Sequence, residues 1–170
     1  YGIVALLSYV YGGVVSDKYQ PKNLITISLF LTSFGGLVMA TYPSYLIMQI
    51  LYGYWGFTTI FLFWGSMIKA TRVWGGTEYQ GKAFGFLDGG RGLVAASFGT
   101  IGVVIFSLFL TSDIKTATLE ERKEAFRYVI IFSSAIIFIT GLLVHYLMDS
   151  DDSKQQNEST KKISTKDIKE

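Results

Sequence analysis

The sequence predicts an all-α membrane protein, a bundle of transmembrane helices. Half of its 170 residues are hydrophobic, 16% are aromatic, and the mean hydropathy is positive at +0.38. Long apolar runs separated by polar connections fill the chain, and charged residues are dense only at 113–127 and in the stretch 149–170. This distribution is typical of a polytopic membrane protein and differs from that of a soluble domain with one core.

Composition also narrows the classes of function. The formal net charge of +2 is too small to indicate a nucleic-acid partner. The chain contains no cysteine and one histidine, which excludes thiolate and histidine-cluster metal sites. Gly89-Gly90-Arg91-Gly92 lacks the Gly-Lys-Ser/Thr ending of a phosphate-binding loop, and no nucleophile–base pair is recognisable. We therefore expect no enzymatic activity, no cofactor and no metal.

Five apolar runs account for the expected helices. The run 1–15 begins without Met and is shorter than the about 20 residues of a spanning helix, so we interpret it as a truncated helix and the chain as a fragment. The run 24–42 would reach about 28 Å, close to the thickness of a bilayer core. The remaining elements are expected at 45–68, 83–110 and 125–148, followed by a polar linker or tail at 149–170.

A short charged turn at 12–22 separates the first two runs. Its Gly, Asp and Pro residues are expected to break the helix, and Lys18 and Lys22 supply positive charge. Short cytoplasmic loops are enriched in Lys and Arg. Loops 16–23 and 69–82 and the tail 149–170 carry ten of these residues, against four in the other connections, so we expect these three segments to be cytoplasmic. The lipid bilayer is the expected environment.

The order Gly13, Asp17, Lys18 and Lys22 resembles a signature of major facilitator superfamily transporters. That signature reads Gly-x-Leu-x-Asp-Arg-x-Gly-x-Lys/Arg and lies between the second and third helices. Gln20 replaces its second Gly, and Val15 replaces its Leu. The order of the apolar runs is also similar to helices two to six of the family's N-terminal half, followed by the start of the central linker.

The resemblance implies a secondary active transporter, a symporter or antiporter that works by alternating access in a plasma membrane or bacterial inner membrane. It implies a small-molecule substrate, a coupling proton or substrate gradient, and a C-terminal half of the same transporter as partner. In the family, the charges at Asp17 and Lys18 hold the cytoplasmic ends of helices together. The alternative reading is a non-transporting multispan protein, such as a receptor-like sensor or a structural membrane protein.

A second motif bears on the substrate. The stretch 78–85, Glu-Tyr-Gln-Gly-Lys-Ala-Phe-Gly, looks like the junction of the fourth and fifth helices in the organic-anion and organophosphate branch of the family. The resemblance therefore implies a small organic solute or anion. The arginines that bind phosphate in that branch come from the first and seventh helices, so no binding residue carries over to this sequence.

Arg91 is the strongest candidate for a residue of the substrate pathway. A helix that starts near Gly81 would place it about 15 Å deep, where a charge costs at least about 2.5–3.5 kcal/mol. Its planar guanidinium suits a carboxylate or phosphate. Two alternatives stay open: 92–110 can span alone, leaving Arg91 at the interface, or Arg91 pairs with Asp88 three residues earlier. Asp88 is either that partner, a partner of Lys69, or a proton carrier.

Two further predictions concern binding and packing. Gln49 is a candidate hydrogen-bond donor to substrate, although such residues more often contact other helices. The span 83–110 carries small residues four apart, which allow close approach of other helices and predict a central position in the bundle. The small residues expected to pack in this way are Gly85, Gly89, Gly92, Ala96 and Gly99.

Overall fold

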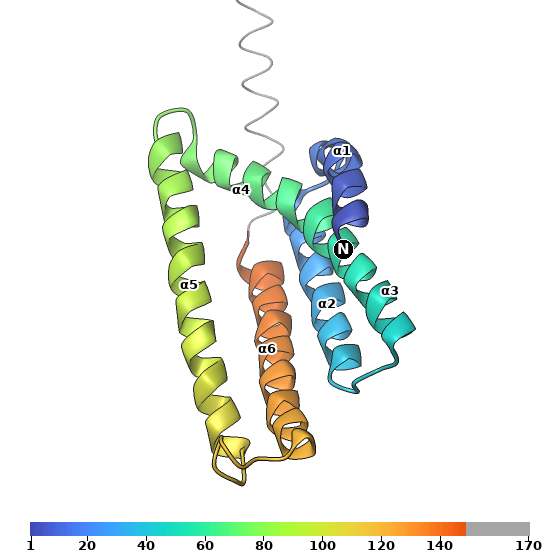
Figure 1. Ribbon diagram of the computed structural model, residues 1–170. Coiled ribbons are helices and arrows are strands. Elements are labelled where there is room, and N and C mark those ends of the chain that lie inside the picture. Colours follow the sequence, from blue (N-terminus) through green and yellow to red (C-terminus); the bar gives the residue numbers. More distant parts are fainter. Residues whose placement is uncertain (149–170) are drawn as a thin grey trace, which may run out of the picture.

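The computed structural model describes residues 1–148, which form helices and no strand (Figure 1). The predicted all-α fold is therefore confirmed, and residues 149–170 lie outside the described part. The elements are α1 (Gly2–Lys18), α2 (Pro21–Met39), α3 (Tyr45–Gly56), the π-helix η1 (Phe57–Trp64), α4 (Gly65–Gly75), α5 (Gln80–Phe109) and α6 (Leu119–Leu147).

Four of these helical segments are long and apolar enough to cross a membrane. They are Pro21–Met39, the continuous rod α3–η1–α4 at Tyr45–Gly75, Gln80–Phe109 and Leu119–Leu147. The rod is one helix whose middle has i→i+5 hydrogen bonds, the π form. π-helical turns are rare, and those that occur often lie at functional sites. Since a π turn holds an extra residue, the rod has a built-in irregularity halfway along its length.

The first turn is shorter than expected. Helix α1 continues through Gly12, Gly13 and Asp17 to Lys18, and α2 begins at Pro21. The expectation that these residues break the helix is wrong, and the connection 16–23 shrinks to 19–20. Glycine costs only about 0.5–1 kcal/mol in a helix, which packing can offset, and proline is well suited to the first helical position.

Three further helix ends include charged or polar residues that were expected to lie in the connections. The third span runs to Gly75 instead of 68, and α5 and α6 begin earlier than expected, at Gln80 and Leu119. Helix α6 starts with a capping box in which Thr118 and Glu121 satisfy each other's backbone N–H groups. Polar first turns thus extend helices that hydropathy alone had ended at the apolar boundary.

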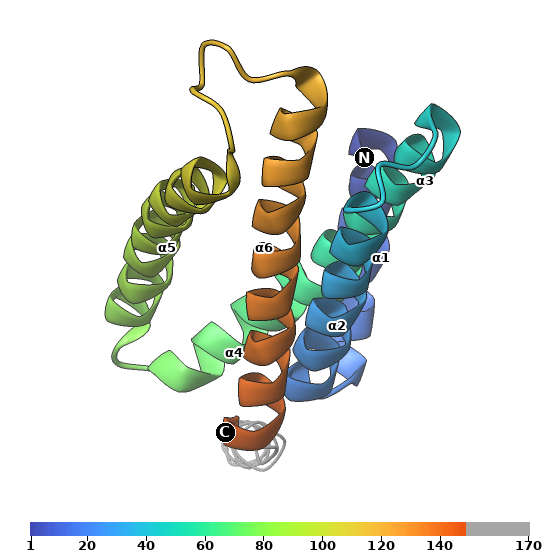
Figure 2. The ribbon, with the colours of Figure 1, turned by 90° about the horizontal axis from the view of Figure 1, so that it is seen from below.

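Helices α2 and α6 lie side by side along their length and make the most extensive interhelical contact among residues 1–148 (Figure 2). The Ser33 hydroxyl donates to the carbonyl of Ser134 at 2.8 Å. Gly36 faces Ser134, and Gly141 lies against the ring of Phe30. Small residues thus bring the two backbones together, as in other membrane helix pairs.

Two hydrogen bonds, here named the polar clasp, join the C-terminal end of α2 and the turn after it to α6. Arg127 Nε donates to the carbonyl of Ala40 at 3.1 Å, and the Tyr42 hydroxyl donates to the carbonyl of Lys123 at 2.6 Å. Burial raises the pKa of the Tyr42 phenol, because the ionised form would lose its hydration. Tyr42 has φ +51°, a left-handed conformation that is uncommon for a large residue. The clasp holds it in this conformation.

Helix α5 packs only loosely against the other helices. It contacts α4 and α6, and Ala83 is its one buried residue (Figure 2). A Cβ added at Gly85, Gly89, Gly92 or Gly99 would meet no atom of the described residues within 4 Å. The expected central position of this helix is therefore wrong for residues 1–148, and the packing role of its small residues stays a prediction.

Candidate functional site

Arg91 lies on α5 between a carboxylate and an aromatic ring. Its Nη1 is 3.3 Å from Asp88 Oδ1, and the guanidinium carbon lies 4.9 Å from the centre of the Trp64 ring. The side chains of Arg91 and Asp88 are 53% and 74% exposed, so the pair by itself contributes about 0–1 kcal/mol. Trp64 comes from η1, which brings the third span into contact with the charged part of α5.

These two charges lie on the wall of a large groove. The groove, here named the Arg91 groove, has a volume of about 1110 Å³ and is formed by α2, α5 and α6. Its lining is mainly apolar, with Leu29 from α2 and Ile136 from α6, and Thr140 adds a hydroxyl. A mostly apolar cavity with a few convergent polar groups is the usual form of a small-molecule site. The arrangement suits a small organic ligand that carries an anionic group.

The structure brings together only part of the predicted pathway set. Asp88, Arg91 and Gly92 line the Arg91 groove, but Gln49 is an exposed residue of α3 and lines no part of it. Lys69, the other partner considered for Asp88, instead reaches α1. Trp64 was not predicted as a site residue. The signal in the sequence was a large aromatic residue in the middle of an apolar span, which by itself does not show what it contacts.

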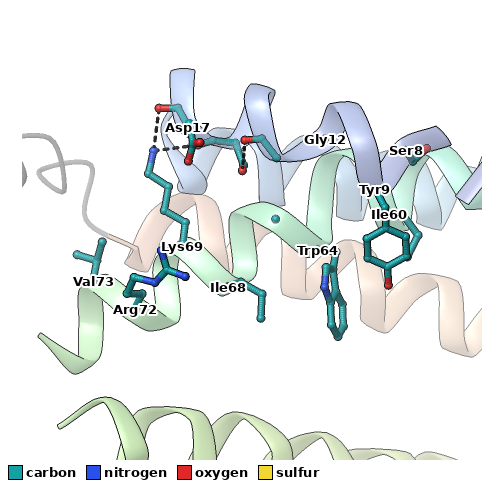
Figure 3. Close-up of a pocket in the computed structure, with 13 residues that line it drawn as sticks. Ser8, Tyr9, Gly12, Asp17, Ile60, Trp64, Ile68, Lys69, Arg72 and Val73 are labelled. Carbon is teal, nitrogen blue, oxygen red and sulfur yellow. Dashed lines mark hydrogen bonds between the residues drawn. The ribbon is translucent and has the colours of Figure 1, made fainter. Parts of the chain in front are cut away.

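A second, smaller cavity lies between α1 and the η1–α4 segment (Figure 3). This α1–α4 groove has a volume of about 320 Å³, and its lining includes Gly13, Asp17, Lys69 and Arg72. Of the signature residues, Gly13 and Asp17 line it, whereas Lys18 and Lys22 do not. The signature end of α1 thus faces the cationic end of α4.

Lys69 caps the C-terminus of α1. Its ammonium donates to the carbonyls of Ser16 and Asp17 at 2.8 and 3.1 Å (Figure 3). It also donates to the carbonyl of Tyr19 at 3.4 Å. The last carbonyls of a helix have no partner within it and carry the negative end of the helix dipole, so a cation there is favourable. The sequence indicated Lys69 only as a topology signal and as a possible partner of Asp88, because no local pattern shows which helix a lysine reaches.

Gly12, and not the signature residue Gly13, is the glycine of α1 that packs closely on another helix. A Cβ added at Gly12 would lie 3.0 Å from the carbonyl oxygen of Phe61 in η1, whereas one at Gly13 would meet no described atom within 4 Å. Gly12 therefore sets the close approach of α1 to η1. Both Gly12 and Gly13 line the α1–α4 groove.

Comparison with known proteins places the chain in a family. Residues 1–169 match the family model described as Major Facilitator Superfamily. The inner membrane protein YqcE of Escherichia coli K12 is 29% identical over 170 residues, covering 99% of this chain and 38% of that protein. The inner membrane protein YihN of the same strain is 23% identical over 137 residues, covering 81% of this chain and 30% of that protein.

The chain thus spans less than two fifths of the length of either of these curated relatives. None of the solved structures gives a match. The family match over nearly the whole chain confirms the resemblance carried by Gly13, Asp17, Lys18 and Lys22, and the chain belongs to the major facilitator superfamily.

Proposed function

We propose that this chain is part of a secondary active transporter that moves a small organic anion by alternating access across a bacterial inner membrane. The family membership and the inner membrane relatives support membrane transport. The observation that carries the choice of an anion is Arg91, held between Asp88 and Trp64 on the wall of the Arg91 groove.

The geometry of Arg91 leaves it free to bind more than its present partner. Asp88 engages only Nη1, at a long 3.3 Å, and a guanidinium carries five N–H donors. A ligand carboxylate or phosphate that accepts two parallel hydrogen bonds would bind more strongly than this single contact. The apolar lining supplied by residues such as Leu29 and Ile136 would strengthen that interaction by excluding water.

Uptake into proteoliposomes that contain the full-length protein tests this proposal. The probes are a hexuronate, a sugar phosphate and a dicarboxylate, with an uncharged hexose as the matched control. We expect saturable uptake of at least one anion, inhibited by the others, and none of the hexose. Uptake of the hexose alone would contradict the proposal that the substrate is an anion. Binding without uptake of any probe would favour the receptor-like sensor.

The signature end of α1 is proposed to be the cytoplasmic gate. The Asp17 carboxylate is exposed and forms no ion pair with any residue in 1–148. A carboxylate at a helix C-terminus is disfavoured by the helix dipole by about 0.3–1 kcal/mol, so a helix end from the C-terminal half of the same transporter is its proposed partner. Loss of that contact would favour the inward-open state.

The orientation of the connections can be tested by labelling. Single cysteines at Gln20 and Thr77 in a cysteine-free full-length protein are expected to react only with a membrane-permeant maleimide, since these turns and the tail 149–170 are proposed to be cytoplasmic. A cysteine at Thr116 should react with an impermeant reagent added outside. Thr116 is exposed, whereas the neighbouring Ala117 is buried and would react poorly. External labelling of Gln20 would reverse the orientation.

A further inference from the structure

We propose that η1 is a register switch that couples the Arg91 groove to the C-terminal end of α1. A change from π to α winding would alter both sites at once. The proposal rests on the proposed function for the role of Arg91, but the coupling itself can be measured without substrate.

The winding of η1 provides the two states. Its eight residues lie inside one rod between α3 and α4, and the same residues could be wound as an α-helix. Each residue of an α-helix advances about 100° around the axis, so a change of one residue in the winding turns α4 by about 100° relative to α3. Small changes of register within a packed helix are a known means of switching.

Hydroxyl groups of α2 hold the π form. The Ser28 hydroxyl donates to the carbonyl of Thr58 at 2.8 Å, and the Thr32 hydroxyl donates to Thr58 Oγ1 at 3.0 Å. Thr58 is completely buried and belongs to η1. These bonds place one peptide group and one side chain of η1 against fixed partners, so they favour the winding in which Thr58 faces α2.

Against the opposite helix, η1 packs on a smooth surface. The α1 residues that are buried are small: Ala5, Ser8, Gly12 and Ser16. A Cβ at Gly12 would lie 3.0 Å from Phe61 O, and one at Gly65 would lie 2.9 Å from Ser16 Oγ. Because even an added Cβ would lie within about 3 Å of a neighbouring atom here, a rotation that brought a larger η1 side chain to this face would displace α1. The winding of the rod is therefore linked to the position of α1.

Both contacts that the switch would change lie at the C-terminal end of η1 or shortly after it, in α4. Trp64 is the last residue of η1, and its ring extends from the rod toward α5 (Figure 3). The Arg91 guanidinium lies over this ring. Five residues later, Lys69 caps the carbonyls at the end of α1. A rotation of about 100° at this point would remove Trp64 from Arg91 and Lys69 from α1 together. An anion that draws Arg91 away from Trp64 would therefore loosen the end of α1, where Asp17 lies.

Hydrogen exchange measured by mass spectrometry on the full-length protein tests the coupling. Ser28→Ala removes the hydroxyl that holds Thr58, and Ser33→Ala is the matched control. Both serines are buried in α2 and donate to a carbonyl at 2.8 Å, but Ser33 donates to α6. We expect Ser28→Ala to speed exchange about five- to tenfold both in 57–64 and in 13–19, the size of effect expected from one lost hydrogen bond. Ser33→Ala should leave both segments unchanged.

A second experiment tests the coupling in the opposite direction, from the end of α1 to η1, with a variant far from the hydroxyls of Ser28 and Thr32. Coupling is reciprocal, so Lys69→Met, which removes the cap of α1, should also speed exchange in 57–64. The proposal is overturned if Ser28→Ala affects 57–64 alone, if Lys69→Met affects 13–19 alone, or if Ser33→Ala reproduces the pattern of Ser28→Ala. Since no substrate is added, these outcomes are independent of whether an anion is transported.

Discussion

Arg91→Ala is expected to abolish uptake of the transported anion, lowering kcat/KM by about 100-fold or more, the loss expected from two charge-assisted hydrogen bonds. Arg91→Lys should restore little activity, because an ammonium cannot make the parallel pair of bonds that a guanidinium makes. The measurement is the initial rate of uptake into proteoliposomes, normalised to the amount of inserted protein. Unaltered insertion together with lost uptake would assign Arg91 to the substrate pathway.

Arg122→Ala is the matched control for this experiment. Arg122 donates to the carbonyl of Ile114 in the connection before α6 and is not part of the Arg91 groove, so its loss should leave uptake near the unsubstituted rate. Unchanged uptake in Arg91→Ala would contradict the pathway role. The exposed pair with Asp88 would then be an interfacial anchor, the alternative that the sequence left open.

Gly141→Ala is expected to destabilise the helix pair α2–α6 by about 1–3 kcal/mol, the usual effect of overpacking a filled interface. The added Cβ would lie 2.7 and 2.9 Å from two ring carbons of Phe30. That ring cannot move away freely, because it also packs on Phe138 with ring centres 4.9 Å apart. The measurement is the thermal midpoint of the full-length protein in detergent, with the fraction of folded protein at each temperature read by size-exclusion chromatography.

The double variant Gly141→Ala with Phe30→Leu is the control for the cause of this loss. If the clash with the Phe30 ring is responsible, the smaller side chain should recover part of the stability, and the two substitutions should be non-additive. A thermal midpoint that Gly141→Ala leaves unchanged would show that α6 moves to accept the methyl group, and that the contact does not limit stability.

The helical class and the number of long apolar helices could be read from the sequence, because hydrocarbon length and backbone hydrogen bonding restrict what can span a bilayer. Helix ends could not. Gly12, Gly13 and Asp17 were expected to break a helix, yet they lie within α1. Their local preferences are worth a few tenths to about 1 kcal/mol each, and tertiary packing overrides them. Hydropathy also ended the third span at 68, before the amphipathic turn that carries Lys69 and Arg72.

Some residues of the candidate site could also be identified from the sequence, and others only from the structure. Arg91 and Asp88 were identifiable from the sequence because a charge in an apolar span is costly, and their spacing placed them on one helix face. Trp64 was not identifiable as a neighbour of Arg91, since the two residues come from different spans. The small residues of α5 were read as a packing face, but among the described residues the close glycine contacts lie on α1, α2, α3, α4 and α6 instead.

What the sequence determined by itself is the environment of each segment: which stretches are apolar enough for lipid, where charges interrupt them, and the family signature around Asp17. What only the tertiary structure decided is which helix meets which, and therefore the partners of single polar groups. Lys69 on the end of α1 and Ser28 on the π-helical carbonyl of Thr58 are contacts between separate spans. The reason is physical: hydropathy depends on each residue alone, whereas a hydrogen bond between helices depends on the packing of both backbones.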